Sequence, residues 1–327
     1  MIITRRSFVA TTAGALVVPG FAGRALAQGL PVLKKKDKYK IGFAQTESNN
    51  PWRLAQTQSM RDEAAKRGWQ LVYTDAAGSA AKQVADVRSM IAQRVDVILL
   101  APREEKPLVP AVMEAKKAGI PLFCIDRSVD REAAKPGRDY IAFIGSDFVQ
   151  EGHMAAEAFA KAVNGKAKII ELQGSVGASP ANDRMKGFKE GIAKFPEMQI
   201  VASQSGDFAR DKGRQVFETL YQAHPDATAL YGHNDEMTMG AIAAMEAAGK
   251  TPGKDIMIVS IDGTKDGAQA VADGKIAVLV ECNPHFGPKA FDAVVAYANG
   301  EKIPEWVVNT DRLFTKDNIA SYLPEAF

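Results

Sequence analysis

Ile125-Asp126-Arg127-Ser128 and Ile261-Asp262-Gly263-Thr264 share one pattern, in which an apolar run ends in Ile-Asp and is followed by a turn. Each closes a series of short β-branched runs that alternate with helical patterns. Such a βαβ series predicts a parallel, doubly wound sheet. Because the series occurs twice, the sequence predicts an α/β protein with two Rossmann-like, doubly wound parallel-sheet domains.

The two series match element for element. In the first we expect strands at 39–44, 69–74, 95–100 and 121–125, with helices at 52–67, at 82–94 and up to 118. In the second we expect strands at 168–172, 200–203, 228–231 and 256–261, with helices at 182–194, at 211–223 and up to 248. A strand at 276–281, a helix at 287–299 and an extended piece at 306–313 suit chain crossings between two domains better than a third domain.

Polar residues lie at the predicted strand ends, where open α/β sheets bind ligands. Two aromatic residues, Trp52 and Phe208, could stack on a sugar ring. Hydrogen bonds to ionised groups are worth about 1.5–3 kcal/mol, more than neutral ones, so charged residues suit sugar hydroxyls. The candidates are Asp126, Arg127, Arg184, Asn234, Asp262 and Glu281.

Each candidate also has a purely structural interpretation. Trp52 follows Pro51 at a helix start and could be a core or surface residue, and an Asp that ends a strand is often only a helix cap. Arg184 by itself is more typical of a solvated surface. The combination points to a binding cleft more strongly than any single residue does.

The sequence resembles the type I periplasmic sugar-binding proteins over essentially its whole length after residue 27. The resemblance is closest to the ribose-binding and galactofuranose-binding members. It is carried in order by Asn49-Asn50-Pro51-Trp52, Ile125-Asp126-Arg127-Ser128, Asn182-Asp183-Arg184-Met185-Lys186-Gly187-Phe188, His233-Asn234-Asp235-Glu236-Met237 and Ser260-Ile261-Asp262-Gly263.

The resemblance implies the type I periplasmic binding protein fold, a three-segment hinge and a cleft that holds a monosaccharide. It also implies a monomer that delivers sugar to the membrane permease of an ABC importer, without a cofactor or a metal. We expect one domain at 28–142 plus 283–309 and the other at 143–282 plus 310–327. The residues expected to line the cleft are Trp52, Asp126, Arg127, Arg184, Phe208, Asn234 and Asp262.

Three departures from the ribose-binding pattern bear on the sugar. Arg53 replaces an aromatic, Ala101 an amide and Glu281 a glutamine. Arg53 and Glu281 also occur in the galactofuranose-binding pattern, as do the segments 172–179 and 203–208. We therefore expect Arg53 and Glu281 to contact the ligand, with galactofuranose or a similar hexose favoured.

The first 27 residues resemble a signal peptide. Thr4-Arg5-Arg6-Ser7-Phe8-Val9 precedes an apolar stretch and Ala25-Leu26-Ala27, which predicts cleavage before Gln28. The paired arginines favour the twin-arginine export route over the ordinary secretory one. A membrane anchor is the alternative, but the apolar run is short and contains Pro19. We expect a protein exported to the periplasm.

Other function classes fit the sequence less well. The formal net charge is only +2, so the sequence lacks the positive charge that nucleic-acid binding requires. A transcriptional regulator would need a DNA-binding helix-turn-helix at the N-terminus, where this sequence has a predicted signal peptide. We find no nucleotide-binding or hydrolase loop, and no metal-ligand spacing among the four histidines. A glycosidase would need a raised carboxyl pKa, whereas Arg127 beside Asp126 favours ionised acceptors. A sugar-processing enzyme and a sugar sensor for a chemoreceptor or sensor kinase remain the alternatives.

The two cysteines, Cys124 and Cys282, both lie in apolar, strand-like stretches. Buried free thiols are the commoner state in such surroundings, and a disulfide between them is the alternative.

Overall fold

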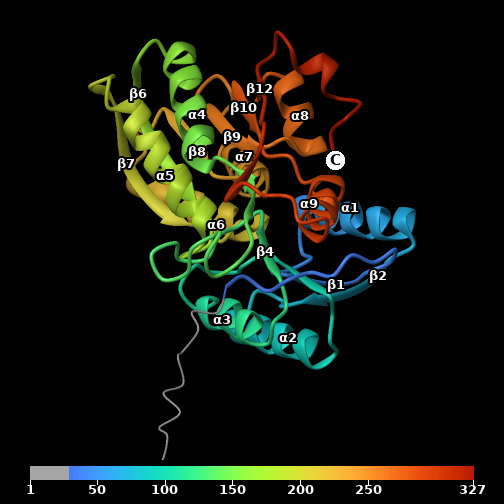
Figure 1. Cartoon of the computed structure of the whole chain (residues 1–327). Coiled ribbons are helices and arrows are strands. Elements are labelled where there is room, and N and C mark those ends of the chain that lie inside the picture. Colours follow the sequence, from blue (N-terminus) through green and yellow to red (C-terminus); the bar gives the residue numbers. More distant parts are fainter. Residues whose placement is uncertain (1–28) are drawn as a thin grey trace, which may run out of the picture.

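The computed structural model describes residues 29–327, so the predicted signal peptide lies outside the described residues. It contains two six-stranded sheets, one in the lower and one in the upper part of Figure 1. The α/β class and the two doubly wound sheets predicted from the sequence are confirmed. No helix among residues 29–327 has the length and apolar character that a membrane crossing requires.

The first sheet has the order β11-β5-β4-β3-β1-β2, and all its strands are parallel. Every residue of β3, β4 and β5 is buried, because helices cover both faces of the sheet, and this explains the unbroken apolar runs of β3 and β4. The strands are β1 (Lys40–Gln45), β2 (Gln70–Asp75), β3 (Val97–Leu100), β4 (Leu122–Ile125), β5 (Phe143–Ser146) and β11 (Trp306–Asn309).

The second sheet repeats this order as β12-β10-β9-β8-β6-β7. Its strands are parallel except for β12, which pairs antiparallel with β10. The strands are β6 (Lys166–Gln173), β7 (Glu197–Ser205), β8 (Ala229–Gly232), β9 (Met257–Asp262), β10 (Val278–Glu281) and β12 (Leu313–Phe314).

The helices pack in pairs on the two sheets. In the first domain α2 (Ala80–Ala92) contacts α3 (Val109–Lys117) on one face, and α1 (Pro51–Arg67) contacts α9 (Gly287–Ala298) on the other (Figure 1). In the second domain α4 contacts α5, and α6 contacts α7. These helices, with α8 and a final 3-10 turn, are α4 (Phe148–Ala162), α5 (Ser179–Ile192), α6 (Arg210–Ala223), α7 (Asp235–Ala247), α8 (Lys265–Ala272) and η1 (Ile319–Ser321).

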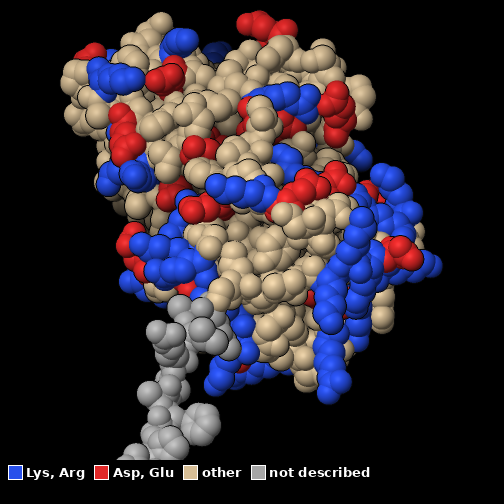
Figure 2. All heavy atoms as spheres, in the orientation of Figure 1, with Lys and Arg blue, Asp and Glu red and all other residues tan. Residues whose placement is uncertain are grey.

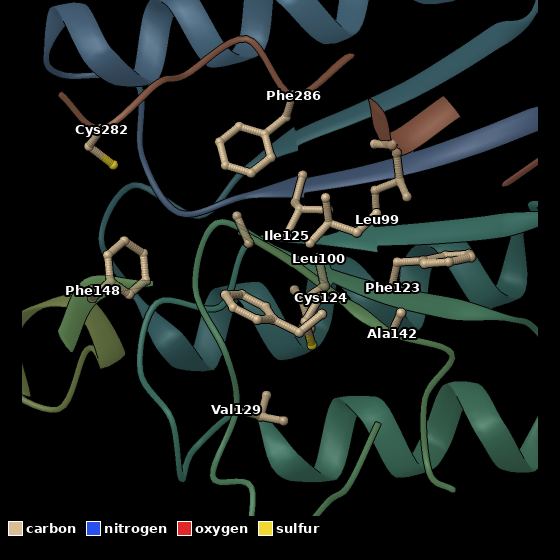
Figure 3. Packing of buried hydrophobic residues seen from close by; sticks show 14 of the residues in the cluster. Leu99, Leu100, Phe123, Cys124, Ile125, Val129, Ala142, Phe148, Cys282 and Phe286 are labelled. Atoms are coloured by element: carbon tan, nitrogen blue, oxygen red, sulfur yellow. The ribbon is translucent and has the colours of Figure 1, made fainter. Parts of the chain in front are cut away.

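The core of the first domain lies between its sheet and these helices. Figure 3 shows Leu99, Phe123 and Ile125 packed together there. Cys124 and Cys282 are both buried free thiols, and burial raises the pKa of Cys124 to about 12. Burial also raises the pKa of Cys282 well above its ordinary value, so neither thiol is ionised at neutral pH.

The chain crosses between the sheets three times. The first crossing lies between β5 and α4, the second follows β10, and the third joins β11 to β12. The sequence analysis assigned residues from 143 onward to the second domain, but β5 pairs with β4 and β11 in the first sheet. The first crossing therefore comes after Ser146, because Phe143 and Ile144 complete the ladder beside Cys124 and Ile125.

Candidate functional site

A cavity lies between the carboxyl ends of the two sheets. Its volume is about 30 Å³. All its lining residues are buried, so the two domains have to separate before a larger ligand can reach it. The cavity is lined by Asn50, Trp52, Arg53, Asp126, Arg127, Pro180, Arg184, Phe208, Asn234, Asp262 and Cys282.

The two strand-ending aspartates occupy equivalent places in the two domains. Asp126 follows β4 and has a φ of 61°, and Asp262 ends β9 with a φ of 138°. Asp tolerates positive φ better than most residues, because its short polar side chain can bond locally. These backbone turns bring both carboxylates to the cavity from opposite sides.

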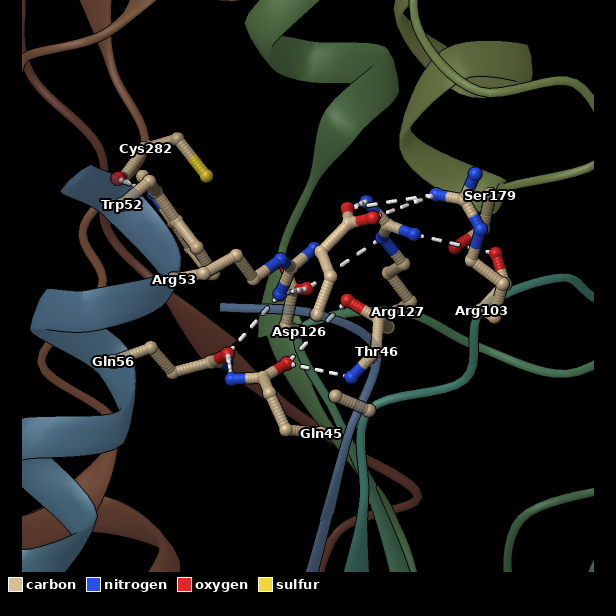
Figure 4. A network of polar contacts seen from close by, with 12 residues as sticks. Gln45, Thr46, Trp52, Arg53, Gln56, Arg103, Asp126, Arg127, Ser179 and Cys282 are labelled. Carbon is tan, nitrogen blue, oxygen red and sulfur yellow. Dashed lines mark hydrogen bonds and ion pairs between the residues drawn. The ribbon is translucent and has the colours of Figure 1, made fainter. Parts of the chain in front are cut away.

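Arg53 and Trp52, at the start of α1, form one wall of the cavity. The Arg53 Nη1 donates to Asp126 Oδ2 at 2.6 Å and to Gln56 Oε1 at 3.0 Å (Figure 4). Its guanidinium carbon lies 4.6 Å from the centre of the Trp52 ring. The helix begins there because Asn50 caps it, accepting from the Arg53 backbone N–H at 2.9 Å.

Arg127 has unused hydrogen-bonding capacity inside the cavity. Its Nη1 donates to the Arg103 carbonyl at 3.2 Å, but its buried Nε has no hydrogen-bond partner among the described residues. Asp126 lies 3.8 Å from that nitrogen, beyond hydrogen-bond distance. Burial and the neighbouring Arg53 lower the pKa of Arg127. An unpaired buried donor is costly, so this site favours a ligand that offers an oxygen acceptor.

Arg184, on α5, lines the cavity and is held by two hydrogen-bond partners. Its Nε donates to Glu151 Oε2 at 2.7 Å and its Nη1 to the His233 carbonyl at 2.5 Å. Glu151 and Asp262 raise the pKa of Arg184, which is therefore charged.

The Asp262 carboxylate accepts no hydrogen bond from residues 29–327, and its nearest cationic contact is Arg184 Nη2 at 3.9 Å. Burial raises the pKa of Asp262 well above its ordinary value. A carboxylate in this state gains stability from any ligand that brings hydroxyl donors.

Phe208 and Asn234 form the wall of the second domain. Phe208 has a φ of 58°, and its ring centre lies 5.3 Å from the Arg127 guanidinium carbon. Asn234 caps α7 through the Met237 N–H and donates to the Phe208 carbonyl at 3.2 Å. The amide of Asn234 thereby fixes the turn that carries the Phe208 ring.

The structure brings together eight of the nine site residues predicted from the sequence. Glu281 does not line the cavity. Its carboxylate instead accepts hydrogen bonds from Arg312 Nε at 2.7 Å and Nη2 at 2.8 Å, beside the third crossing. Arg312 comes from the segment between β11 and β12, and no local sequence pattern predicts that it pairs with Glu281.

Three lining residues were absent from the prediction: Asn50, Pro180 and Cys282. Asn50 and Pro180 lie at helix starts, and each is adjacent to or within a segment that carried the family resemblance. Cys282 follows β10, so a strand-end rule applied to that strand would have found it.

Residues 29–327 contain no group of three or more His, Cys, Asp or Glu side chains that could hold a metal. The one buried histidine that approaches the cavity lining, His233, bonds Glu171 Oε1 at 3.1 Å through its ring. The polar groups of the cavity are donors and acceptors suited to a hydroxylated molecule.

Comparison with known proteins gives consistent results. A model of the periplasmic binding protein domain matches residues 41–302. The galactofuranose-binding protein YtfQ of Escherichia coli is 40% identical over 289 residues, which cover 87% of this chain and 88% of that protein.

Two solved structures are similar throughout. One is the binding protein of the arabinose ABC transporter of Shewanella sp. ANA-3 with α- and β-L-arabinofuranose, at 39% identity and a TM-score of 0.83, covering 88% of this chain and 95% of that one. The other is a Mycobacterium smegmatis structure in complex with β-D-fucofuranose, at 42% identity and a TM-score of 0.83, covering 88% and 94%.

Proposed function

The chain belongs to the periplasmic binding protein family, and from this premise we propose that it captures a furanose sugar, D-galactofuranose first, between its two domains. It is a sugar-binding protein of the kind that serves ABC importers, and it is not an enzyme. The identity of the sugar and the roles of the individual residues are the parts that we propose.

The observation that carries the proposal is the polar imbalance of the closed cavity. Arg127 Nε lacks an acceptor, and the Asp262 carboxylate lacks a donor, from residues 29–327. A sugar hydroxyl can serve either group, because a hydroxyl both donates and accepts. Trp52 and Phe208 supply the apolar surface that the C–H face of a sugar ring requires.

The charges around the cavity favour a neutral ligand. Arg53 pairs with Asp126, and Arg184 pairs with Glu151 and approaches Asp262. Each arginine of the lining has a carboxylate nearby, because Glu47 Oε1 also lies 3.9 Å from Arg127 Nη2. A uronate would bring a further negative charge next to Asp126 and Asp262, which costs free energy in a buried site.

The furanose form is supported by what the similar proteins hold. Galactofuranose, L-arabinofuranose and D-fucofuranose, which appear in the names of three of them, share the configuration of the furanose ring and differ in the substituent outside it. Arg53 occupies the position where the ribose-binding pattern has an aromatic. We infer that Arg53, held by Asp126, selects against ribose.

We further propose that the protein acts as a monomer, and that it is exported with a signal peptide that is cleaved before Gln28. The domains are divided at the crossings: residues up to 146 together with 283–309 form one domain, and 147–282 together with 310–327 form the other. The sugar then contacts both domains, with the closed form as the one presented to the permease.

Calorimetry with a sugar panel tests the proposal. Galactofuranose should bind tightest, followed by L-arabinose and D-fucose through their furanose fractions, with ribose weaker and galacturonate without measurable binding. Native mass spectrometry of freshly purified protein should show a retained neutral hexose. Tight binding of galacturonate would overturn the proposal. So would a lower Kd for ribose than for galactofuranose, L-arabinose and D-fucose.

A further inference from the structure

Arg103 reaches across the cleft without lining the cavity. It follows β3 in the first domain, and its guanidinium contacts two loops of the second domain. Nη1 donates to Ser175 Oγ at 2.8 Å, and Nη2 donates to Asp207 Oδ1 at 2.9 Å. Arg103, labelled in Figure 4, is only 8% exposed and Ser175 is buried, whereas the Asp207 side chain is 40% exposed.

These contacts lie at the edge of the cleft that is farther from the hinge. The three crossings leave the sheets at β5, β10, β11 and β12, which lie together at one edge of each sheet. Ser175 and Asp207 follow β6 and β7, the last two strands at the opposite edge. A hinge rotation separates groups most where they are farthest from the axis, so these bonds break early when the cleft opens.

The first domain holds Arg103 in place on its own. Its Nε donates to the Gly78 carbonyl at 3.2 Å, and Glu47 Oε2 lies 3.4 Å from Nη1. Its backbone N–H donates to Gln83 Oε1 at 2.8 Å. The side chain is therefore oriented before the second domain arrives, which lowers the entropy cost of making the bond.

On the other side, Asp207 is joined to a wall of the sugar site. Asp207 and Phe208 are consecutive residues with φ values of 56° and 58°. Two consecutive non-glycine residues in the left-handed region persist only where surrounding contacts fix them. The Phe208 ring lies so close to Gly174 that a Cβ there would stand 1.9 Å from it, so the ring position depends on the position of this turn.

We propose that Arg103 is a positioning residue that clamps the closed cleft. By binding Asp207 and Ser175 it holds the Asp207–Phe208 turn against the first domain, and with it the aromatic wall over the sugar. The clamp slows sugar release and has little effect on sugar capture, because it forms only after the domains meet. This inference rests on the proposed sugar-binding function.

The kinetic test uses Arg103→Gln and Asp207→Asn, which each remove one charge of the pair, and Asp207→Asn also keeps the size of the side chain. Stopped-flow measurement of the tryptophan fluorescence with galactofuranose should give dissociation at least about tenfold faster in either variant, since each loses a charge-assisted bond. The association rate should change less than about threefold. In the double variant the two effects should not add, because both act on one bond.

Arg88→Gln is the matched control. It removes an arginine that pairs with Glu114 at 2.7 Å in the same domain, away from the cleft, and should leave both rates unchanged. Equal melting temperatures of the ligand-free variants and the wild type would separate a clamp from a merely structural role.

A second measurement does not depend on the identity of the sugar. Spin labels at Lys117→Cys on α3 and Lys212→Cys on α6 report the distance between the domains, because both positions are exposed and the native cysteines are buried. Arg103→Gln should shift the ligand-free distribution toward more open distances. If galactofuranose fails to bind the wild type, the proposed sugar is wrong and these distances alone test the clamp. The clamp proposal would be overturned if Arg103→Gln showed the same distances as the wild type and, should the sugar bind, the same release rate.

Discussion

The indole Nε1 of Trp52 donates a hydrogen bond of 2.7 Å to the carbonyl oxygen of Cys282. Trp52 belongs to the wall of the cavity, and Cys282 is the first residue of the second crossing between the domains. The bond therefore ties a cavity wall of the first domain to a segment that crosses between the domains. Trp52 is thus a buried residue and a cavity residue at once.

Replacing Trp52 should weaken sugar binding. Trp52→Ala removes the aromatic surface, worth about 1–3 kcal/mol, so the Kd should rise at least about tenfold. Trp52→Phe keeps the ring face and loses the bond to Cys282, so its Kd should rise less. Calorimetry measures both, with Trp306→Phe as the control, because Trp306 Nε1 makes a similar bond to the Gly145 carbonyl outside the cavity. An unchanged Kd in Trp52→Ala would make Trp52 a core residue only.

The two strand-end aspartates should be essential for binding and should differ in their effect on the ligand-free fold. Asp126→Ala and Asp262→Ala should each raise the Kd at least about a hundredfold, since each removes charge-assisted hydrogen bonds to hydroxyls. Asp126→Ala leaves the buried Arg53 unpaired and should lower the melting temperature. Asp262→Ala removes a buried carboxylate that lacks a bond, so the melting temperature should not fall. Normal sugar binding by either variant would contradict the strand-end assignment.

Stability should depend on pH through Asp311, which joins the second and third crossings by accepting from the Asn283 N–H at 3.2 Å. Burial raises the pKa of Asp311 to about 6, above its value in an unfolded chain. Between these two values the folded protein binds more protons than the unfolded one, so this group destabilises the fold as pH rises.

The variant Asp311→Asn cannot titrate and isolates this effect. Its free energy of unfolding relative to the wild type should increase by roughly 2 kcal/mol from pH 4 to pH 7. Urea unfolding at several pH values measures it. A difference that does not vary with pH would show that Asp311 titrates normally.

Export is expected to depend on the paired arginines of the leader, which lies outside the described residues. The mature protein should begin at Gln28, and changing Arg5 and Arg6 together to Lys should leave it inside the cell. Intact-mass analysis of the periplasmic fraction checks both points. Export that survives the double change would exclude the twin-arginine route.

Much of the fold could be predicted from sequence because hydrophobic periodicity and the turn residues that end helices and strands are local signals. The helix expected at 52–67 is α1 (Pro51–Arg67), and the strand expected at 121–125 is β4 (Leu122–Ile125). The sequence analysis assigned no element to 143–162, where β5 and α4 form. β5 has only four residues, and its place in the first sheet is set by pairing with β4 and β11, which is a long-range contact.

The residues that line the cavity could be predicted where they lie at strand ends. Contacts that depend on a partner distant in sequence could not be predicted. Asp126 and Asp262 end equivalent strands, so topology alone brings them to the cavity. Glu281 also ends a strand, but Arg312 binds it from another segment. Arg103 and Asp207 are 104 residues apart, and only the closed arrangement of the domains shows that they meet.

The most direct test of the central claim is solution scattering with and without galactofuranose, combined with the melting temperature of the same samples. The cavity is buried, so the sugar can reach it only through an open state, and it should favour the closed one by contacting both domains. The radius of gyration should fall when sugar is added. The free energy of unfolding should rise by roughly 2.7 kcal/mol at a hundredfold excess over the Kd. Tight binding with an unchanged scattering profile would contradict closure of two domains around the sugar.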